Sequence, residues 1–332
     1  MTRYVIVGNG VAGTTAAEKI REHDPEGTIT ILSAEDIPFY YRIRLPEVLA
    51  GEVDEARLVA KKEAWYRDRS IDLHLQTFVT EADADTKTLR TESGQEFPFD
   101  KLLLANGSSS FIPPIQGADT PGVFALRSMQ DVRDIRTWAE KATRVVLIGG
   151  GLLGLEAGNG LRKLGREITV VEFFPRLLPR QLDTDGGARL QSMLEGMGFS
   201  FRLGAKTTSI SGQKAVQEVH LESGETLPAD LVLISAGVRP NLELAKQLGL
   251  ETDKGIKVNE HLETSRKDIF AAGDVTEFQG RVYGIWPAAE EQGRLAGHNM
   301  AGPREAYQGT VMANTLKVVG IDLASAGEID AD

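Results

Sequence analysis

The chain has 332 residues, of which 41% are hydrophobic, and 37 Lys and Arg against 48 Asp and Glu give it a net charge of −11. This composition argues against a disordered chain, a collagen-like fibre and a basic nucleic-acid-binding protein. At about 100–200 residues per domain, the length predicts two or more hydrophobic cores.

Cysteine is absent from the sequence. A structural disulfide, a cysteine-ligated zinc or iron–sulfur centre and a redox-active dithiol are therefore excluded from these residues. The histidines lack the paired spacing of a metal site, so no metal is predicted and we interpret them as ordinary polar positions. No apolar run approaches the roughly 20 residues that cross a bilayer, and residues 1–3 lead straight into a strand-like run, so the expected location is the cytoplasm.

A glycine-rich turn follows the first apolar run of the chain. Residues 4–7 lead into Gly8, Gly10 and Gly13 of the sequence GNGVAG, apolar residues then recur at helical spacing until Pro25, and residues 28–32 form a second apolar run. This order predicts a strand, a tight turn, a helix and a second strand, with the glycines at the first turn of a βαβ unit.

The same order of features returns in the middle of the chain. Residues 144–148 lead into Gly149, Gly151 and Gly154 of the sequence GGGLLG, and a helical pattern then ends before the apolar run 168–171. The two copies are too far apart to be one solenoid repeat, so we predict two separate doubly wound sheets.

Each glycine turn predicts a dinucleotide site. In the GxGxxG pattern the first glycine allows the bend, the second lets the backbone approach a pyrophosphate, and the third lets the helix pack closely on the strand. An acid that can bind a ribose follows at about 20 residues in both copies, as Glu35 and as Glu172. Two such sites in one chain indicate a flavin held beside a nicotinamide, between which hydride can pass.

Three other apolar runs end in glycine, where the backbone must turn tightly or come close to a ligand. Residues 101–105 precede Gly107, residues 230–236 precede Gly237, and residues 268–272 precede Gly273 and Asp274. The Ser-rich and Pro-rich stretch after Gly107 is typical of a domain exit.

These motifs, taken in order, resemble those of the FAD-dependent pyridine nucleotide-disulfide oxidoreductases. The segments are GNGVAG, LLLANG, GGGLLGLEAG, SAGVRPN and TSRKDIFAAGDV, and the resemblance runs from residue 1 to about residue 320. It is greater to the cysteine-free branch of that family, the NADH:rubredoxin reductases and the flavin module of NADH-dependent nitrite reductases, to which the segment EDIPFYYRIRLPEVLAG is especially similar.

The resemblance implies an α/β fold with two Rossmann-like, doubly wound three-layer domains, the NAD domain being inserted in the FAD domain. Residues 1–115 would form the first part of the FAD-binding domain, residues 116–241 the NAD-binding domain and residues 242–309 the second part of the FAD-binding domain. Residues 310–332 would begin a C-terminal interface domain, of which a short, truncated remnant is expected.

The resemblance also assigns ligands to FAD and NADH. Around FAD it implies Gly8, Gly10 and Gly13 at the pyrophosphate, Glu35 at the adenosine ribose, the backbone of Val79 at the adenine, Ala105, Gly107 and Gly273 along the cofactor, Arg127 at the phosphates and Asp274 at the ribityl chain. Around NADH it implies Gly149, Gly151, Gly154, Glu172 and Gly237. The alternatives are a solvated surface arginine for Arg127 and a turn aspartate for Asp274.

The resemblance places a catalytic pair at the reactive part of the flavin. Arg42 would bind near the reactive edge of the ring, opposite Glu156, for which the alternative is a first-turn acid favoured by the helix dipole. Pro287 and Ala288 would begin a helix whose N-terminus points at the flavin and stabilises negative charge on it, although proline suits any helix start.

Other residues of the same segments have two interpretations or depart from the family. Phe39, Tyr40 and Tyr41 are either a stacking cluster beside the flavin ring or the core under a loop. Asn106 stands where a threonine is usual, and Leu152 stands where an aromatic gate often covers the flavin.

The predicted function is that of an FAD-dependent NADH oxidoreductase, which passes electrons from NADH through FAD to a small redox protein such as rubredoxin, or to a nitrite-reductase-type partner or fused redox centre. The alternatives are an NADH oxidase that uses oxygen and a non-catalytic NADH-sensing flavoprotein. Glu172 predicts a preference for NADH over NADPH, which Arg176 and Arg180 could offset. No nucleic-acid or membrane partner is expected, and oligomerisation stays open because the expected interface domain is short.

Overall fold

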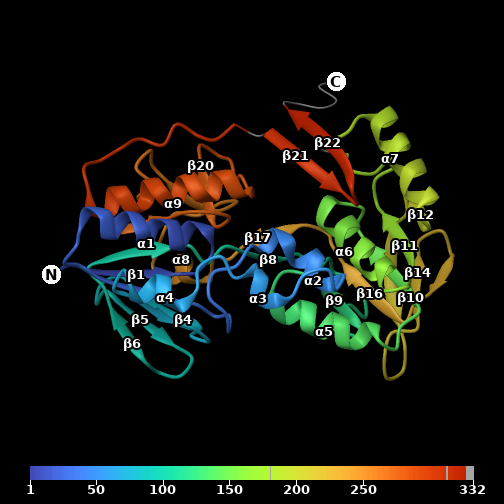
Figure 1. Ribbon diagram of the computed structural model, residues 1–332, viewed down its shortest axis with the longest axis horizontal. Coiled ribbons are helices and arrows are strands. Elements are labelled where there is room, and N and C mark those ends of the chain that lie inside the picture. The colour runs from blue at the N-terminus through green and yellow to red at the C-terminus, as the bar shows by residue number, and fades with distance from the viewer. Residues whose placement is uncertain (180, 312, 327–332) are drawn as a thin grey trace. The chain divides into compact units, whose positions relative to one another are not determined.

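The computed structural model describes residues 1–179, 181–311 and 313–326, and in it the chain divides into two compact units (Figure 1). Unit 1 comprises Met1–Tyr40, Val59–Ser109 and Arg239–Val311, and unit 2 comprises Tyr41–Leu58, Ser110–Val238 and Met312–Asp332. Residues 41–58 therefore belong to unit 2, although the chain on both sides of them belongs to unit 1.

Unit 1 is built on a parallel sheet in the order β19-β7-β1-β2-β3. Its strands are β1 (Arg3–Val7), β2 (Thr28–Leu32), β3 (Ile71–His74), β7 (Lys101–Leu104) and β19 (Ile269–Ala271). Successive residues of β1 point to opposite faces, so Tyr4 and Ile6 enter one hydrophobic cluster and Val5 and Val7 another.

Two further layers cover the faces of this sheet. Helices α1 (Val11–His23) and α9 (Trp286–Ala301) pack on one face. The opposite face is covered by an antiparallel sheet and a short helix, which are β4 (Val79–Asp83), β5 (Thr88–Thr91), β6 (Glu96–Pro98) and α8 (Glu243–Gln247). Unit 1 therefore has the three layers expected of a doubly wound domain.

Helices α1 and α9 meet through small residues. A Cβ atom at Gly293 would lie 2.4 Å from the carbonyl oxygen of Ala12, and one at Gly297 would lie 2.4 Å from that of Ala16. No larger residue fits at either glycine, so the two helices are locked side by side although they come from distant parts of the sequence.

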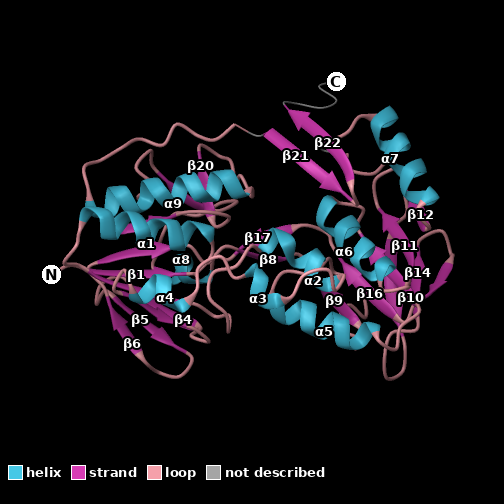
Figure 2. Cartoon of the chain, viewed as in Figure 1, coloured by secondary structure: helices cyan, strands magenta, loops and turns pink. Residues whose placement is uncertain are grey.

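Unit 2 repeats the three-layer plan (Figure 2). Its parallel sheet has the order β12-β11-β10-β16-β9, formed by β9 (Val123–Ala125), β10 (Arg144–Ile148), β11 (Glu167–Glu172), β12 (Phe199–Leu203) and β16 (Leu231–Ile234). One face carries the antiparallel sheet of β13 (Thr207–Ser211), β14 (Glu218–Leu221) and β15 (Thr226–Pro228). Outside segment 41–58, the described helices of the unit are α5 (Met129–Ala139), α6 (Leu152–Lys163) and α7 (Thr184–Gly196).

Segment 41–58 packs on the helices of unit 2. It contains η1 (Arg42–Arg44), α2 (Leu45–Leu49) and α3 (Glu55–Leu58). Gly160 of α6 allows α2 to approach closely, since a Cβ atom there would lie 3.1 Å from the carbonyl oxygen of Pro46. Two ion pairs add to the contact, Lys163–Glu52 and Arg133–Glu55.

The remaining elements are short. They are α4 (Glu63–Arg67), β8 (Ser108–Ser110), β17 (Val238–Pro240), β18 (Ile256–Val258) and β20 (Thr276–Phe278), and a hairpin of β21 (Ala313–Val318) and β22 (Ile321–Ala326). The hairpin is the described part of the region expected to begin an interface domain; residues 312 and 327–332 lie outside the described residues. Within the described ranges, no helix is both long and apolar enough to cross a membrane.

Candidate functional site

The turn between β1 and α1 can be formed only by glycine at two of its three positions. Gly8 has φ +111°, and a Cβ atom on it would lie 2.1 Å from the carbonyl oxygen of Ala105. A Cβ atom on Gly13 would lie 2.0 Å from the carbonyl oxygen of Gly8. These two glycines therefore close the turn against β7 and bring α1 down onto it.

Gly10, between them, faces open space instead. It is the N-cap of α1 in extended conformation, no side chain caps the helix, and nothing lies within 4 Å of a Cβ atom placed there. The neighbouring Asn9 Nδ2 is buried and has no hydrogen-bond partner among the described residues. An open space at a helix N-terminus, with a spare buried donor beside it, fits a phosphate group.

The turns after β7 and β19 lie at the same edge of the sheet, because parallel neighbours end at one edge. After β7, Asn106 Nδ2 donates to the carbonyl of Asn241 (3.0 Å), and the amide of Asn241 donates to the carbonyl of Gly107 (3.0 Å). Asn106, the residue that departs from the family's threonine, thus holds the Ala105–Gly107 turn. After β19, Asp274 Oδ2 accepts the hydroxyl of Ser108 (2.8 Å).

The other residues expected around FAD are divided between the units. Glu35 accepts the hydroxyl of Tyr40 (2.6 Å), Val79 begins β4, and Pro287 and Ala288 lie in the first turn of α9, which begins at Trp286 as predicted. Arg42 and Arg127 belong to unit 2, where Arg42 Nη1 donates to the carbonyl of Arg127.

The three aromatic residues of the expected stacking cluster differ in burial. Phe39 and Tyr40 are buried in unit 1, and the ring of Phe39 lies 5.8 Å from that of Trp286. Tyr41 belongs to unit 2 and is exposed. Phe39 and Tyr40 therefore have core positions in unit 1, as the second interpretation expects of them.

The turn between β10 and α6 repeats the geometry of the first. Gly149 has φ +109°, and its Cβ atom would lie 2.3 Å from the carbonyl oxygen of Ser235; a Cβ atom on Gly154 would lie 2.9 Å from the carbonyl oxygen of Gly149. Gly151 is the N-cap of α6 and has nothing within 4 Å of a Cβ atom. Gly237, with φ +98°, closes β16 and also faces open space.

Glu172 holds this second turn in place. Its buried carboxylate accepts the amides of Gly150 (2.6 Å) and Phe174 (2.8 Å). A carboxylate has about four acceptor positions, so lone pairs remain for ribose hydroxyls. Arg176 donates to the carbonyls of Leu182 (3.3 Å) and Pro179 (3.4 Å), and Arg180 lies outside the described residues.

Two aromatic residues beside Glu172 were missed by the sequence interpretation. Phe173 and Phe174 are 65% and 50% exposed, and their rings meet edge to face at 5.5 Å. The signal was present, since two adjacent phenylalanines directly follow the acid in a chain with 6% aromatic residues.

Glu156 and Arg42 have separate partners in the structure. Glu156 Oε1 accepts the amide of Val319 (2.7 Å) from the turn of the C-terminal hairpin, and burial raises the pKa of its carboxyl. An ion pair with Arg42 is not formed within the described ranges. Because α6 begins at Leu152, Glu156 lies beyond its first turn, so the alternative interpretation as a first-turn acid is wrong.

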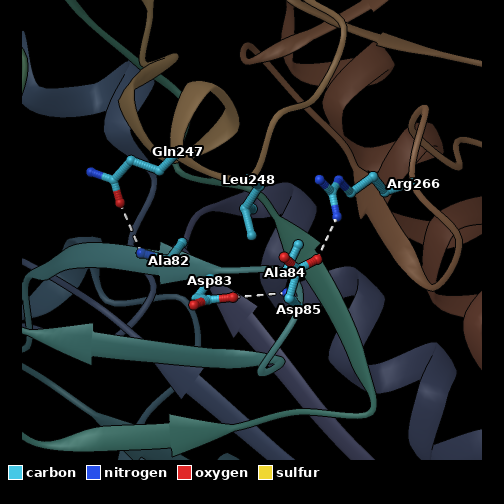
Figure 3. A pocket seen from close by; sticks show the side chains of 7 residues that line it. All are labelled: Ala82, Asp83, Ala84, Asp85, Gln247, Leu248 and Arg266. Atoms are coloured by element: carbon cyan, nitrogen blue, oxygen red, sulfur yellow. Dashed lines mark hydrogen bonds and ion pairs between the residues drawn. The ribbon is translucent and has the colours of Figure 1, made fainter.

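A polar depression on unit 1 offers no competing site (Figure 3). It is lined by Ala82, Asp83, Ala84, Asp85, Gln247, Leu248 and Arg266, none of them a predicted site residue. Its main polar groups already pair with one another, because Gln247 Oε1 accepts the amide of Ala82 (2.8 Å) and Arg266 lies 3.2 Å from Asp85.

Known proteins resemble the chain along almost all of its length. A family model described as pyridine nucleotide-disulphide oxidoreductase matches residues 2–293. The assimilatory nitrate reductase electron transfer subunit of Bacillus subtilis is 38% identical over an alignment of 334 residues, gaps included, which covers 99% of this chain and 43% of that protein. NADH-rubredoxin oxidoreductase of Clostridium acetobutylicum is 33% identical over 329 residues, which cover 99% of this chain and 82% of that protein.

A solved structure agrees with these matches. The NAD-dependent persulfide reductase from A. fulgidus has a TM-score of 0.92 at 31% identity, with 98% of this chain and 64% of that one covered. The chain spans about two fifths of the length of the Bacillus subtilis relative.

Proposed function

Because the chain belongs to the pyridine nucleotide-disulphide oxidoreductase family, whose members use FAD and NADH, we propose that it passes electrons from NADH through FAD to a small redox protein such as rubredoxin, or to a nitrite-reductase-type partner or fused centre. One observation carries the proposal. Each unit has a glycine turn that is sterically closed at its first and third glycines and open at its second, which is the shape that a dinucleotide pyrophosphate requires.

We assign FAD to unit 1. Gly10 and the N-terminus of α1 would receive the pyrophosphate, Asp274 the ribityl chain, and the first turn of α9 the negative charge of the reduced ring. When bound, FAD supplies a two-electron acceptor that releases electrons singly. The role of the protein is to hold that acceptor and to exclude its other reactions.

We assign NADH to unit 2. Gly151 and the N-terminus of α6 would receive its pyrophosphate, and Glu172 its adenosine ribose. A thiol relay within these residues is excluded, because the sequence has no cysteine. The electrons must therefore leave to an acceptor outside the described chain, and we place the reaction in the cytoplasm, where NADH is regenerated.

The acceptor is tested by steady-state NADH oxidation with rubredoxin, ferredoxin, oxygen and ferricyanide. Faster turnover with a protein carrier than with oxygen supports the proposal. Equal turnover with oxygen favours an NADH oxidase, and flavin that NADH reduces but no acceptor reoxidises favours a sensor. A flavin that NADH does not reduce would contradict all three functions.

Glu172→Gln should weaken the preference for NADH over NADPH. A 2′-phosphate about 4 Å from Glu172 would be repelled by about 1 kcal/mol in water and about 4 kcal/mol at an intermediate dielectric, or about fivefold to several hundredfold in binding. We expect the ratio of kcat/KM values for the two nucleotides to fall by about fivefold or more. Glu167→Gln, at the opposite end of β11, is the matched control and should leave the ratio unchanged. An unchanged ratio in both variants would return Glu172 to its role at the amides of Gly150 and Phe174.

Glu156→Gln should slow flavin reduction more than it weakens NADH binding. Glutamine keeps an oxygen that can accept the amide of Val319, so the variant removes the charge and keeps the contact. Stopped-flow reduction at saturating NADH measures the effect, and the Kd of NADH is taken from the concentration dependence. Glu156→Leu, which also removes the contact, shows how much of any loss comes from the hairpin. Wild-type reduction by Glu156→Gln would exclude a catalytic charge at this position.

A further inference from the structure

A chain of hydrogen bonds, buried at its centre and part-buried elsewhere, runs through unit 1 from the Gly273 turn to the segment that follows α9. Its central residue is Gln292 of α9, which is only 1% exposed. Gln292 Oε1 accepts the amide of Gly273 (2.9 Å), and Nε2 donates to the hydroxyl of Tyr307 (3.3 Å). Both ends of the side-chain amide are therefore used, and together they determine its orientation.

The hydrogen bonds beyond Tyr307 run in one direction. Thr310 Oγ1 donates its single hydrogen to Glu291 Oε2 at 2.7 Å. The 2.7 Å contact between Thr310 and Tyr307 must then be donated by Tyr307. Burial raises the pKa of Tyr307, so its hydroxyl keeps the hydrogen that this direction requires. The chain ends at a carboxylate, which is the strongest acceptor in it.

The Gly273 amide needs such a partner. Gly273 follows β19 with φ +85°, and its amide donates to a side chain of α9. This amide is part-buried, and an amide shielded from water and left unpaired costs free energy comparable to a lost hydrogen bond. Gln292 satisfies this amide from one side, and Ser108 holds the adjacent Asp274 from another at 2.8 Å. Gln292 is itself fixed, because the neighbouring Gly293 locks α9 against Ala12.

We propose that Gln292 is a positioning residue for the flavin site, which holds the Gly273–Asp274 turn where Asp274 binds the ribityl chain, and that Tyr307 holds Gln292 in turn. The proposal rests on the function proposed above, in which Asp274 is that ligand. Because the hydrogen bonds are continuous, FAD binding should also tighten residues 302–311, which carry Tyr307 and Thr310.

The test compares the FAD affinities of three variants by fluorescence titration of the apoprotein. Gln292→Leu removes both hydrogen bonds and should bind FAD about tenfold more weakly. Tyr307→Phe removes only the hydroxyl that accepts from Gln292 and should show an intermediate loss of FAD affinity. Asn299→Leu is the matched control, because the Asn299 side chain is buried on the same helix but, among the residues that the structure describes, bonds only to His261 and Glu305. It should lower the melting temperature and leave FAD affinity within about twofold.

Two results would overturn the proposal. One is wild-type FAD affinity in Gln292→Leu. The other is that Gln292→Leu and Asn299→Leu lose FAD affinity in the same proportion to the decrease in their melting temperatures. If Gln292→Leu does not fold, Tyr307→Phe provides the test, because unchanged FAD affinity in that variant would exclude a role for Tyr307 in holding Gln292. Limited proteolysis gives a second readout: FAD should protect residues 302–311 in the wild type and protect them less in Tyr307→Phe.

A further variant separates this proposal from the proposed function. Asp274→Ala with full FAD affinity would contradict the assignment of the ribityl ligand, and with it the premise of the positioning role. Weak FAD binding by Asp274→Ala, together with wild-type binding by Gln292→Leu, would instead overturn the positioning role alone.

Discussion

A Gly10→Leu protein is expected to fold and to be colourless. Gly10 has φ −82°, which any residue adopts, and a Cβ atom there meets nothing within 4 Å, so the chain itself tolerates the change. The leucine would fill the space that the pyrophosphate needs and block the amides of α1. Loss of two charge-assisted hydrogen bonds, about 3 kcal/mol, weakens FAD binding by about a hundredfold. The absorbance at 450 nm relative to 280 nm measures the bound flavin, and circular dichroism measures the fold.

Gly8→Leu is the control that separates steric closure from ligand binding. A side chain on Gly8 would meet the carbonyl oxygen of Ala105 at 2.1 Å, so this variant should lose the fold together with the flavin. A folded Gly10→Leu protein that retained full flavin would falsify the placement of FAD at the first turn.

Gly151→Leu is expected to stay yellow and to lose reduction by NADH. Gly151 has the same open surroundings at the N-cap of α6 as Gly10 has at α1, and it lies in unit 2. We expect NADH binding to weaken by about a hundredfold for the same reason. Stopped-flow spectroscopy measures the reduction rate, and dithionite, which needs no nucleotide site, should still bleach the flavin.

The two substitutions also control for each other. If Gly10→Leu kept its flavin while Gly151→Leu lost it, the cofactor assignments of the two units would be exchanged. If either substitution alone removed both FAD binding and NADH binding, the turns would have a structural role that their open surroundings do not indicate.

The glycine turns could be predicted because their geometry is encoded locally. The spacing of Gly149, Gly151 and Gly154 after an apolar run specifies strand, turn and helix, and the structure adds which carbonyl oxygens close the first and third positions. Segment 41–58 could not be assigned in this way. Its position depends on Gly160 and on ion pairs with residues over 75 positions away in sequence, which no local pattern reports.

The surroundings of Glu156 show a second limit of the sequence. Its partner is the amide of Val319, a β-branched residue at φ 56° in a two-residue hairpin turn. Two-residue hairpin turns normally carry Asn, Asp or Gly at their first position, so a valine at position 319 does not indicate a tight turn. The resemblance places Arg42 opposite Glu156 at the flavin, and no resemblance of these segments reports that a distant backbone amide is the hydrogen-bond partner of Glu156.

The glycine contact between α1 and α9 has a consequence for the order in which the protein folds on the ribosome. The two helices are about 260 residues apart in sequence, so at about 5–20 residues per second α1 waits roughly 13–50 s for its partner. During that time the strands of unit 2 between residues 123 and 234 are already complete and can pair. We therefore expect the nascent chain to expose the apolar face of α1 until α9 has been synthesised.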